Sequence, residues 1–464
     1  MNDFDLKAID KDKKVFFIGI GGISMSALAQ ILKNDGYFVF GSDFKESDTV
    51  NELIASGIPV TVGHKAESVE SAGLVVYTAA IKADNPELMH ARELNIPCVE
   101  RATLLGAMMK NYKYPVAVSG THGKTTATSM LSHVLCESDL DPTILVGGVL
   151  PLIGGNFRDG GKDFFVTEAC EYCGSFLKFY PLYSIILNIE EDHLDYFKDI
   201  DDIIECFSQF VDKTPKNGAV IANFDDEEVI RAVKQAPCRV VSYSLGNKDC
   251  DYTVCNLQFD ENGYPQFDVL YGGKPYISVR LSVPGLHNVS NSLAIIAAAN
   301  LLGVSKEGIK RGLLSFKGTN RRFEFKGEVN GAKIYDDYAH HPTEIKATLS
   351  AAKATGAKRI RCVFQPHTYT RSLALKEEFA KSFFDCDDLI ITDIFAAREI
   401  DTGLIHSKDL VKAVNENSKN AMYMKDFSEI EKYFFDTAQE GDIIFTMGAG
   451  DVYKIGESIV KSGK

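Results

Sequence analysis

Residues 119–126 read Ser-Gly-Thr-His-Gly-Lys-Thr-Thr, and this segment governs the interpretation of the whole chain. An apolar run at 115–118 comes directly before it, and a helix-like segment at 127–136 follows. The order of strand, glycine turn and helix predicts a phosphate-binding loop, because converging backbone N–H groups and the helix dipole both favour an anion. Lys124 would reach the β- and γ-phosphates and the Thr125 hydroxyl would hold Mg²⁺, so the pattern indicates ATP as the ligand.

The spacing of this loop departs from the standard pattern in one place. Val118 stands where the first glycine of a conventional phosphate loop would be. Spacing alone therefore leaves open an ordinary glycine-rich turn with a surface lysine. The strand before the loop and the helix after it favour the nucleotide site.

Composition bounds the class of protein. The 464 residues predict two to four domains, and 45% hydrophobic with 25% charged residues is typical of a soluble globular chain. A net charge of −14 argues against a general nucleic-acid binder. No apolar run approaches the roughly 20 residues that span a bilayer, and residues 1–14 have no signal-peptide core, so we expect a cytoplasmic protein without membrane insertion. The ten cysteines form no disulfide framework, and Cys170 and Cys173 lack the partners of a zinc site.

Strand-like and helix-like segments alternate along the chain, which predicts an α/β fold with mostly parallel sheets. The first of three blocks opens with an apolar run at 15–18 that leads into Gly19-Ile20-Gly21-Gly22, and Asp43 follows the next strand. This pattern is close to the dinucleotide-binding fingerprint, although Ser24 replaces its third glycine. A nucleotide site and a plain strand-to-helix turn are equally compatible with it.

The second block begins near residue 111 and contains the phosphate loop, with further strands expected at 163–167, 184–188 and 218–222 and antiparallel strands within 250–281. The third block follows Arg321-Arg322. It contains a hairpin at Asn330-Gly331 and further strands and helices. Their expected positions are strands at 359–364, 389–393 and 442–446 and helices at 343–355 and 373–384.

Several polar clusters follow predicted strands. We expect the strand that ends at Glu168 to come directly after the loop strand, which would place this carboxylate beside Thr125 as a Mg²⁺ ligand; a solvated loop carboxylate is the alternative. Arg321-Arg322 would stabilise a triphosphate or form a solvated linker. Residues 336–342, Asp-Asp-Tyr-Ala-His-His-Pro, are dense enough in polar groups to suggest a substrate site. Residues 364–371 close another strand, where an arginine could hold a small carboxylate.

A series of motifs follows one order along the chain from about residue 14 to the C-terminus. They lie at 19–25, 120–126, 168–172, 188–193, 285–291, 321–324, 336–344 and 364–371. In this order they resemble the Mur ligases of peptidoglycan synthesis. The resemblance implies a Rossmann-like N-terminal domain, a central P-loop-type ATPase and a Rossmann-like C-terminal domain, which we place at 1–108, 109–321 and 322–464.

The resemblance also implies an activity: ATP-dependent joining of L-alanine to the lactyl carboxylate of UDP-N-acetylmuramate through an acyl phosphate, with Mg²⁺. A ligase that attaches a murein tripeptide to the same sugar nucleotide is the alternative within the family. An NAD-dependent dehydrogenase and a non-catalytic UDP-sugar sensor are alternatives from other classes, and Lys124 with Glu168 argues against both. We expect a monomer or weak homodimer that binds no nucleic acid.

The resemblance also implies roles for the individual residues of these motifs. ATP would contact Gly120, Thr121, His122, Gly123, Lys124, Thr125, Thr126, His287, Asn288, Asn291, Arg321 and Asp337. Magnesium would bind Thr125 and Glu168, with a second ion at His193. The UDP-sugar would face Gly21, Gly22, Ser42, Asp43, His64 and Thr78, and the amino acid would face Tyr338, His340, Arg371 and Arg398. The implied catalytic residues are Lys124, Glu168, His193, Arg321 and His340. Two positions depart from the family: Thr368 stands where some members have arginine, and Cys170-Glu171-Tyr172-Cys173 replaces a carboxylate-rich stretch.

Overall fold

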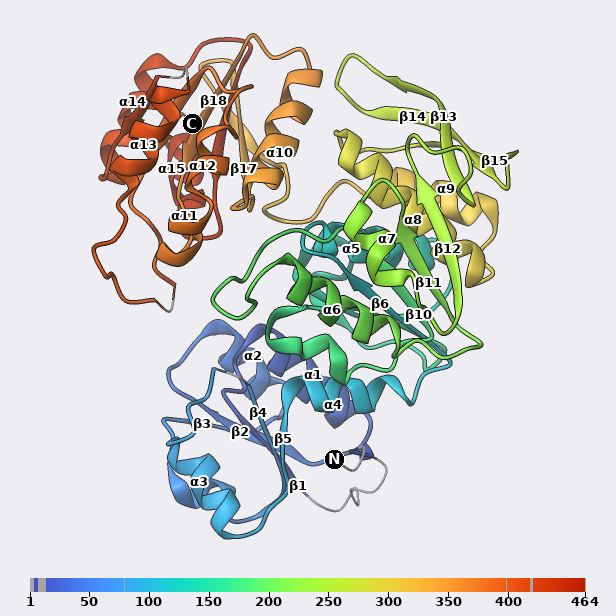
Figure 1. Ribbon diagram of the computed structural model, residues 1–464. Helices are drawn as coiled ribbons and strands as arrows, with labels where there is room; N and C mark the ends of the chain where they lie inside the picture. Colours follow the sequence, from blue (N-terminus) through green and yellow to red (C-terminus); the bar gives the residue numbers. More distant parts are fainter. Residues whose placement is uncertain (1–3, 7–13, 79, 398, 418–419, 464) are drawn as a thin grey trace.

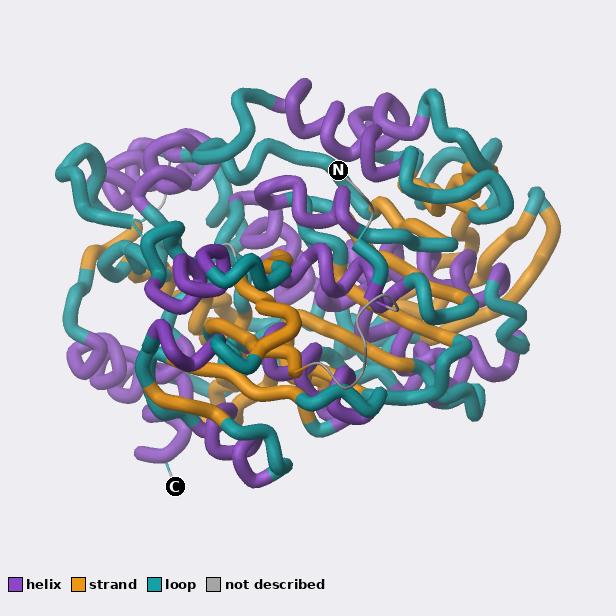
Figure 2. Tube along the Cα trace, turned by 90° about the horizontal axis from the view of Figure 1, so that it is seen from below, coloured by secondary structure: helices purple, strands orange, loops and turns teal. Residues whose placement is uncertain are grey.

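A computed structural model describes residues 4–6, 14–78, 80–397, 399–417 and 420–463. The chain forms three α/β units in sequence order, each built around its own sheet (Figure 1). Figure 2 shows the strands of these sheets lying beneath and between helices. The predicted three-domain α/β fold with mostly parallel sheets is therefore confirmed. No described helix combines the length and apolar character needed to cross a bilayer.

The N-terminal unit contains a parallel sheet in the order β3-β2-β1-β4-β5. Residues 15–18 of β1 are buried, as expected for a strand covered by helices on both faces. Gly41 in β2 is required by packing, because a Cβ there would lie 2.5 Å from the carbonyl oxygen of Phe17. The elements are β1 Lys14–Ile18, α1 Ile23–Asn34, β2 Val39–Asp43, α2 Asp48–Ala55, β3 Val60–Val62, β4 Ala72–Tyr77, α3 Pro86–Glu93, β5 Cys98–Glu100 and α4 Arg101–Met109.

The central unit contains a ten-stranded sheet in the order β15-β14-β13-β12-β11-β10-β6-β9-β7-β8. The antiparallel strands predicted within 250–281 form one edge of it. The elements are β6 Tyr114–Ser119, α5 Lys124–Cys136, β7 Thr143–Leu150, β8 Gly155–Arg158, β9 Phe164–Glu168, η4 Tyr172–Lys178, β10 Tyr183–Ile186, α6 Ile200–Val211, β11 Ala219–Asn223, α7 Glu227–Val233, β12 Arg239–Ser244, β13 Tyr252–Phe259, β14 Pro265–Tyr271, β15 Lys274–Arg280, α8 Leu286–Leu301 and α9 Lys306–Ser315.

One expectation about this sheet was wrong. The strand that ends at Glu168 does not follow the loop strand directly in sequence, because β7 and β8 intervene. In space β9 nonetheless pairs with β6, and Val118 lies opposite Glu168. The glycine-rich sequence of β7 and β8 concealed these strands, since glycine is depleted in strands and suggests loops.

The C-terminal unit contains a sheet in the order β16-β17-β21-β18-β19-β20, in which only β16 pairs antiparallel. The predicted hairpin is present, and Asn330 and Gly331 have φ angles of 49° and 78°, as a type I′ turn requires. The elements are β16 Glu324–Val329, β17 Ala332–Asp337, α10 Pro342–Ala354, β18 Arg359–Phe364, α11 Tyr369–Ala374, α12 Lys376–Ala380, β19 Asp388–Ile391, α13 Ser407–Glu416, β20 Ala421–Tyr423, α14 Phe427–Thr437, β21 Asp442–Met447 and α15 Tyr453–Ser462.

The helix expected at 373–384 was wrong in its bounds. The structure has α11 and α12, separated at Leu375, whose φ and ψ of −103° and 24° are not helical. The break lies four residues after Arg371, at the end of α11. Apolar periodicity in the sequence continues across this point, so it gave no sign of the break.

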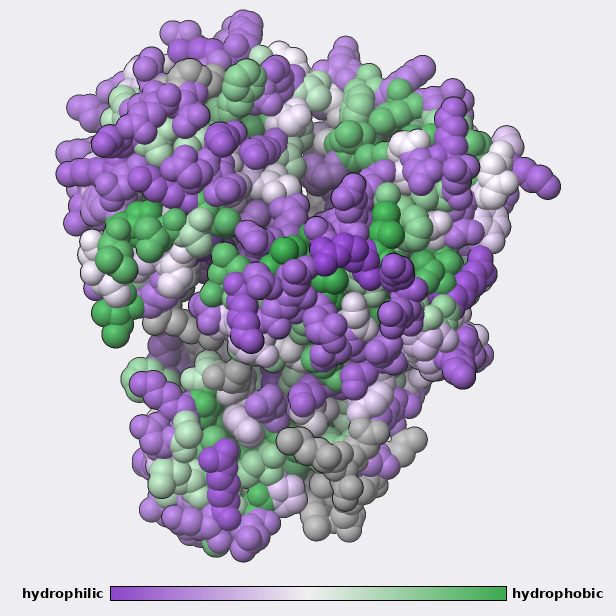
Figure 3. Space-filling view, in the orientation of Figure 1, coloured by the Kyte–Doolittle hydropathy of each residue, from purple (hydrophilic) through white to green (hydrophobic). Residues whose placement is uncertain are grey.

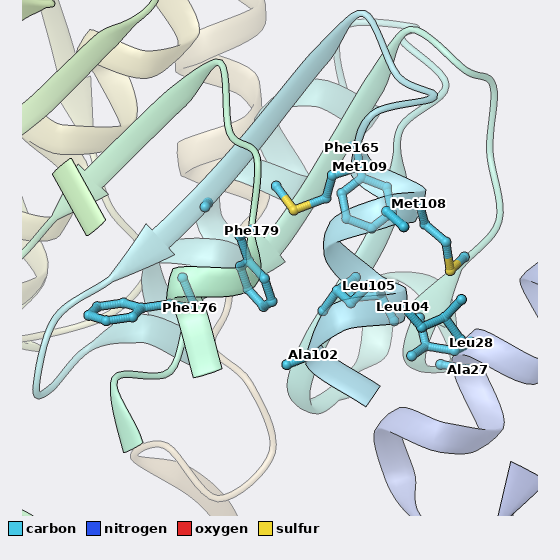
Figure 4. Packing of buried hydrophobic residues seen from close by; sticks show 14 of the residues in the cluster. Ala27, Leu28, Ala102, Leu104, Leu105, Met108, Met109, Phe165, Phe176 and Phe179 are labelled. Carbon is cyan, nitrogen blue, oxygen red and sulfur yellow. The ribbon is translucent and has the colours of Figure 1, made fainter. Parts of the chain in front are cut away.

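The three units are joined in different ways. One hydrophobic cluster extends from α1 through α4 into the central unit, where Leu105 and Met109 pack near Phe165 and Phe179 (Figure 4). The C-terminal unit has separate clusters of its own. Figure 3 shows that hydrophilic side chains dominate this face of the molecule and that it is hollowed between the C-terminal unit and the β13–β14 hairpin. The N-terminal and central units thus share a core, whereas the C-terminal unit does not join it.

Gly106 tests the close contact between α4 and the central unit. A Cβ at this position would lie 1.9 Å from the carbonyl oxygen of Lys178, so Gly106→Ala must displace backbone. We expect a loss of about 2 kcal/mol or more, despite the better helix propensity of alanine. The melting temperature measures this effect, and Gly246→Ala, where nothing lies within 4 Å, is the matched control. Equal melting temperatures for both variants would contradict this packing.

Candidate active site

The phosphate loop has the conformation that its glycines predict. Gly120 and Gly123 have φ angles of 141° and 81°, which favour glycine, and α5 begins at Lys124. The end of β10 holds the loop from the side: the Asn188 carbonyl accepts from the Thr121 N–H at 3.1 Å, and its side chain accepts from the His122 N–H at 2.8 Å. The loop is therefore preformed at the N-terminus of a helix.

Lys124 is held inside the protein by a carboxylate that the sequence interpretation did not assign. Its Nζ donates to the carbonyl oxygens of Gly120 and Thr121 at 2.5 and 3.0 Å and to the Glu171 carboxylate at 3.0 Å. Burial by itself would lower the pKa of Lys124, but Glu171 outweighs it and the pKa is raised. His193 meets the same carboxylate, with Nε2 3.7 Å from Glu171 Oε1. Glu171 lies in the quoted motif at 168–172, which was the available signal.

Glu168 lies at the end of β9, as predicted, beside a two-glycine segment of β7. Its Oε1 accepts from the Gly147 N–H at 2.5 Å. A Cβ on Gly148 would lie 3.3 Å from Thr125 Cγ2, so Thr125 and Glu168 adjoin the same segment. Glu168 and His193 have different neighbours, and the structure does not bring them together as one ligand set.

A cavity of about 720 Å³ lies between the central and C-terminal units, where Figure 3 shows the hollow. The predicted nucleotide residues that line it are His122, Gly123, Thr126, His287, Asn288, Asn291 and Asp337. Burial raises the pKa of Asp337 to about 6, against the opposing effect of Arg322. The size is that of a nucleotide or drug-sized ligand site.

The two arginines at the start of the C-terminal unit have different positions. Arg321 Nε donates to Asp336 at 3.0 Å and its Nη2 to the Gly448 carbonyl at 2.7 Å, so its guanidinium is anchored within its own unit. Arg322 lines the large cavity and lies 3.4 Å from Glu344. The resemblance assigned the ATP contact to Arg321 and not to Arg322. The sequence alone gives no basis for choosing between two adjacent arginines.

His122 forms a polar cluster with Glu190 of its own unit and with Glu344 and His341 of the C-terminal unit. Its Nε2 lies 3.6 Å from Glu190, its Nδ1 lies 3.5 Å from Glu344, and its ring packs on His341 with centroids 4.3 Å apart. Burial would lower the pKa of His122, but the two carboxylates raise it to about 9. Burial lowers the pKa of His341 to about 4. The cluster thus pairs one protonated ring with two carboxylates at a unit boundary.

A second cavity, of about 340 Å³, is lined by the predicted residues Tyr338, Arg371 and His193. Arg371 is already occupied: Nε and Nη2 donate to Asp192 of the central unit at 3.1 and 2.8 Å, and Nη1 donates to His367 at 2.8 Å. Thr368, at the family departure, also lines this cavity and has a φ of 65°, a strained value for a β-branched residue. Arg398, the remaining predicted amino-acid residue, lies outside the described residues.

His340 lies beside this second cavity. Its ring centroid is 5.3 Å from that of Tyr338 and 5.5 Å from that of His367. Burial lowers the pKa of His340 to about 3, so the ring is neutral near pH 7. Nδ1 lies 2.9 Å from the Tyr338 carbonyl oxygen, which can only accept, so the proton is on Nδ1 and Nε2 has the free lone pair.

The predicted UDP-sugar residues meet at the carboxyl edge of the first sheet. The Gly21 N–H donates to Asp43 at 2.8 Å, and Gly22 precedes the first residue of α1. Ser42 donates to Glu87 at 2.6 Å, and His64 Nδ1 lies 2.8 Å from the same carboxylate. Thr78 follows β4 at the same edge. The sequence analysis missed Glu87, which is fully buried. Its partners His64 and Ser42 lie 23 and 45 residues away in the sequence, so no local pattern connects them to it.

Models of one family cover most of the chain. The description "Mur ligase family, catalytic domain" matches residues 14–113, "Mur ligase middle domain" matches 118–299, and "Mur ligase, glutamate ligase domain" matches 321–450. The chain therefore belongs to the Mur ligase family.

Relatives within this family point to one member. The chain is 53% identical over 452 residues to UDP-N-acetylmuramate–L-alanine ligase of Acetivibrio thermocellus, covering 97% of this chain and 96% of the relative. It is 51% identical to the enzyme of the same name from Clostridium acetobutylicum, covering 98% of each. Among solved structures, UDP-N-acetylmuramate–alanine ligase of Thermotoga maritima has a TM-score of 0.80 at 30% identity and covers 97% of this chain and 99% of that one. A murein peptide ligase of Psychrobacter arcticus has a TM-score of 0.70 at 25% identity, covering 97% and 98%.

The raised pKa of His122 predicts a pH-dependent contribution to stability. The folded pKa of about 9 exceeds the ordinary 6.5, so the protonated ring stabilises the folded protein fully below pH 6.5 and ceases to do so as the pH rises through 9. We expect His122→Gln to lower the melting temperature by roughly 3–6 °C near pH 6 and by much less near pH 10.

Melting curves of both proteins across this range check the prediction. His406→Gln, whose side chain is 53% exposed, is the control. A difference that stays constant with pH would show that His122 is not charged in the folded protein.

Proposed function

We propose that this protein is an ATP-dependent ligase that joins L-alanine to the lactyl carboxylate of UDP-N-acetylmuramate in peptidoglycan precursor synthesis. The observation that carries the proposal is the position of the phosphate loop between the two flanking units. Glu168, beside the loop, lines a small cavity with Ser24 of the N-terminal unit, and His122 of the loop lies 3.5 Å from Glu344 of the C-terminal unit. The loop can therefore meet one substrate from each side. The close relatives with this named activity support the choice of substrates.

The residues of the phosphate loop and the large cavity fit a nucleoside triphosphate. The loop N–H groups and the start of α5 would bind the phosphates, with Lys124 moving from Glu171 to the transferring group. The large cavity would take the nucleoside, beside His287, Asn288 and Asn291. Arg322 fits the role of a cation near the phosphates better than Arg321, whose donors are engaged within its own unit.

The residues also fit Mg²⁺, which prefers oxygen ligands. The Glu168 carboxylate accepts only the Gly147 N–H among the described residues, so lone pairs remain for an ion shared with Thr125. His193 would hold a second ion, with Glu171 as the adjoining carboxylate. Bound Mg²⁺ would offset the negative charge that crowds the transferring phosphoryl group.

The chemistry proceeds in two transfers. The lactyl carboxylate attacks the γ-phosphoryl group, giving an acyl phosphate and ADP; the alanine amine then attacks the acyl carbon and phosphate leaves. Arg371 would bind the alanine carboxylate in place of Asp192, and the lone pair on the neutral His340 Nε2 would accept a hydrogen bond from the alanine amine and orient it. The C-terminal unit would close over the acyl phosphate to exclude water.

We also propose the unit boundaries 1–108, 109–321 and 322–464. The end of α4 at Met109 and the start of β16 at Glu324 support them. The structure joins none of the ten cysteines in a disulfide, which supports a cytoplasmic location, since that compartment keeps thiols reduced.

The activity is tested by phosphate release from ATP with UDP-N-acetylmuramate and a panel of amino acids and peptides. We expect release with L-alanine. Release with a murein tripeptide but not with alanine would replace this function by that of the recycling ligase.

Lys124→Ala tests the phosphate loop. We expect turnover to fall by at least about 100-fold, because a cation on the transferring phosphoryl group is lost. Binding of the UDP-sugar in calorimetry should persist, since its candidate residues lie in the N-terminal unit. Lys310→Ala in α9, whose lysine side chain is 41% exposed, is the matched control. Turnover within tenfold of the wild type would refute the assignment.

Arg371→Lys tests the amino-acid site. A lysine cannot form the paired guanidinium contact, so we expect the KM for alanine to rise roughly 10- to 100-fold with little change in the KM for ATP. Arg359→Lys, in the same unit but outside both cavities, is the control. A KM for ATP that rises in parallel would indicate that Arg371 acts on unit closure instead.

A further inference from the structure

A small cavity of about 140 Å³ lies where the N-terminal unit meets the central one. Ser24 and Leu28 of α1 line one side, and Glu168 and Cys170 after β9 line the other. Arg101, the first residue of α4, also lines it. The cavity thus adjoins both the start of the first Rossmann-like helix and the Mg²⁺ candidate beside the phosphate loop.

Arg101 has no countercharge in the described part of the chain. No described carboxylate forms an ion pair with it, and no described group forms a hydrogen bond with its guanidinium. Desolvation in this environment lowers the pKa of Arg101, so the surroundings oppose its charge.

The position of Arg101 in α4 is also unfavourable. A positive charge in the first turn of a helix opposes the helix dipole, and the adjoining acidic residue, Glu100 at the N-cap, is exposed and makes no side-chain cap hydrogen bond. Arg101 therefore combines partial burial, a missing partner and the wrong end of a helix. Each of these costs stability, and an anionic ligand would relieve all three.

The volume and the position of this cavity indicate the class of ligand. Nucleotide-sized ligands need cavities of about 300 Å³ or more, so this one suits only the small end of a larger molecule. A sugar nucleotide at Gly21 and Gly22 would extend past α1 towards Glu168. Resting on the proposed function, we infer that Arg101 binds the lactyl carboxylate of UDP-N-acetylmuramate and presents it to the γ-phosphoryl group of ATP.

The test compares two ligands that differ in the lactyl group. UDP-N-acetylmuramate has this carboxylate, and UDP-N-acetylglucosamine does not. Calorimetry with Arg101→Met should show an affinity for the first ligand about 10- to 100-fold weaker, the range of a charge-assisted hydrogen-bonded pair. The affinity for the second ligand should not change. Arg101→Lys should recover part of the loss.

Arg92→Met is the matched control, because Arg92 is an exposed arginine of the same unit in α3. It should leave both affinities unchanged. The ligand-free melting temperature supplies an independent readout: Arg101→Met should keep or raise it, since a partly buried cation without an ion-pair partner is removed. A structural role for Arg101 would lower it.

The outcomes separate this inference from the proposed function. If the wild type binds neither sugar nucleotide, the proposed function fails and this inference with it. If the wild type binds UDP-N-acetylmuramate and Arg101→Met binds it equally well, the role of Arg101 alone is overturned. An equal loss for both ligands also overturns it, because the guanidinium would then act on the diphosphate or on the packing of the two units.

Discussion

The active region depends on the contact between the end of β10 and the phosphate loop. Asn188 accepts hydrogen bonds from the N–H groups of Thr121 and His122, and Gly120 packs closely on the same segment, where a Cβ would lie 3.0 Å from Leu187 Cβ and 3.2 Å from the Asn188 nitrogen. These contacts fix the start of α5 and therefore the direction of Lys124. They also place His122 at the edge of the neighbouring unit, where it meets Glu344.

Buried charges surround this loop in complementary sets. Lys124 pairs with Glu171, Arg371 with Asp192, and His122 with Glu190 and Glu344, and of these side chains Glu190 is the most exposed. Desolvation offsets much of the attraction within such pairs, and each pair holds its side chains in one place. Polar ligands can exchange for these partners one by one. Arg101 is the exception, since its partner is absent from the described chain.

The two unit boundaries have different physical character. The N-terminal and central units share a hydrophobic cluster through α4, so separating them would expose apolar surface. The central and C-terminal units meet through polar contacts, such as Arg371 with Asp192 and Thr343 with Glu190. A polar boundary with two cavities can open and close at small cost in buried apolar area, which suits a site that must admit substrates and then exclude water.

Local chemistry in the chain was sufficient for the α/β class, for the strand, glycine turn and helix around residues 119–126, and for the strand ends that hold Glu168 and Asp337. Glycine positions, apolar runs and family motifs are short-range signals. They predict where polar side chains gather, because parallel strands place their carboxyl ends at one edge of the sheet. The insertion of β7 and β8 and the break at Leu375 were missed, since glycine content and apolar periodicity masked them.

Only the folded chain decided which charges meet. Glu171 holds Lys124 across 47 residues, Asp192 holds Arg371 across 179, and Arg322 rather than Arg321 lines the large cavity. Arg101 looked like any helical arginine until the two units enclosed it without a partner. Pairing, burial and desolvation depend on distances between segments far apart in sequence, and no local pattern encodes these distances.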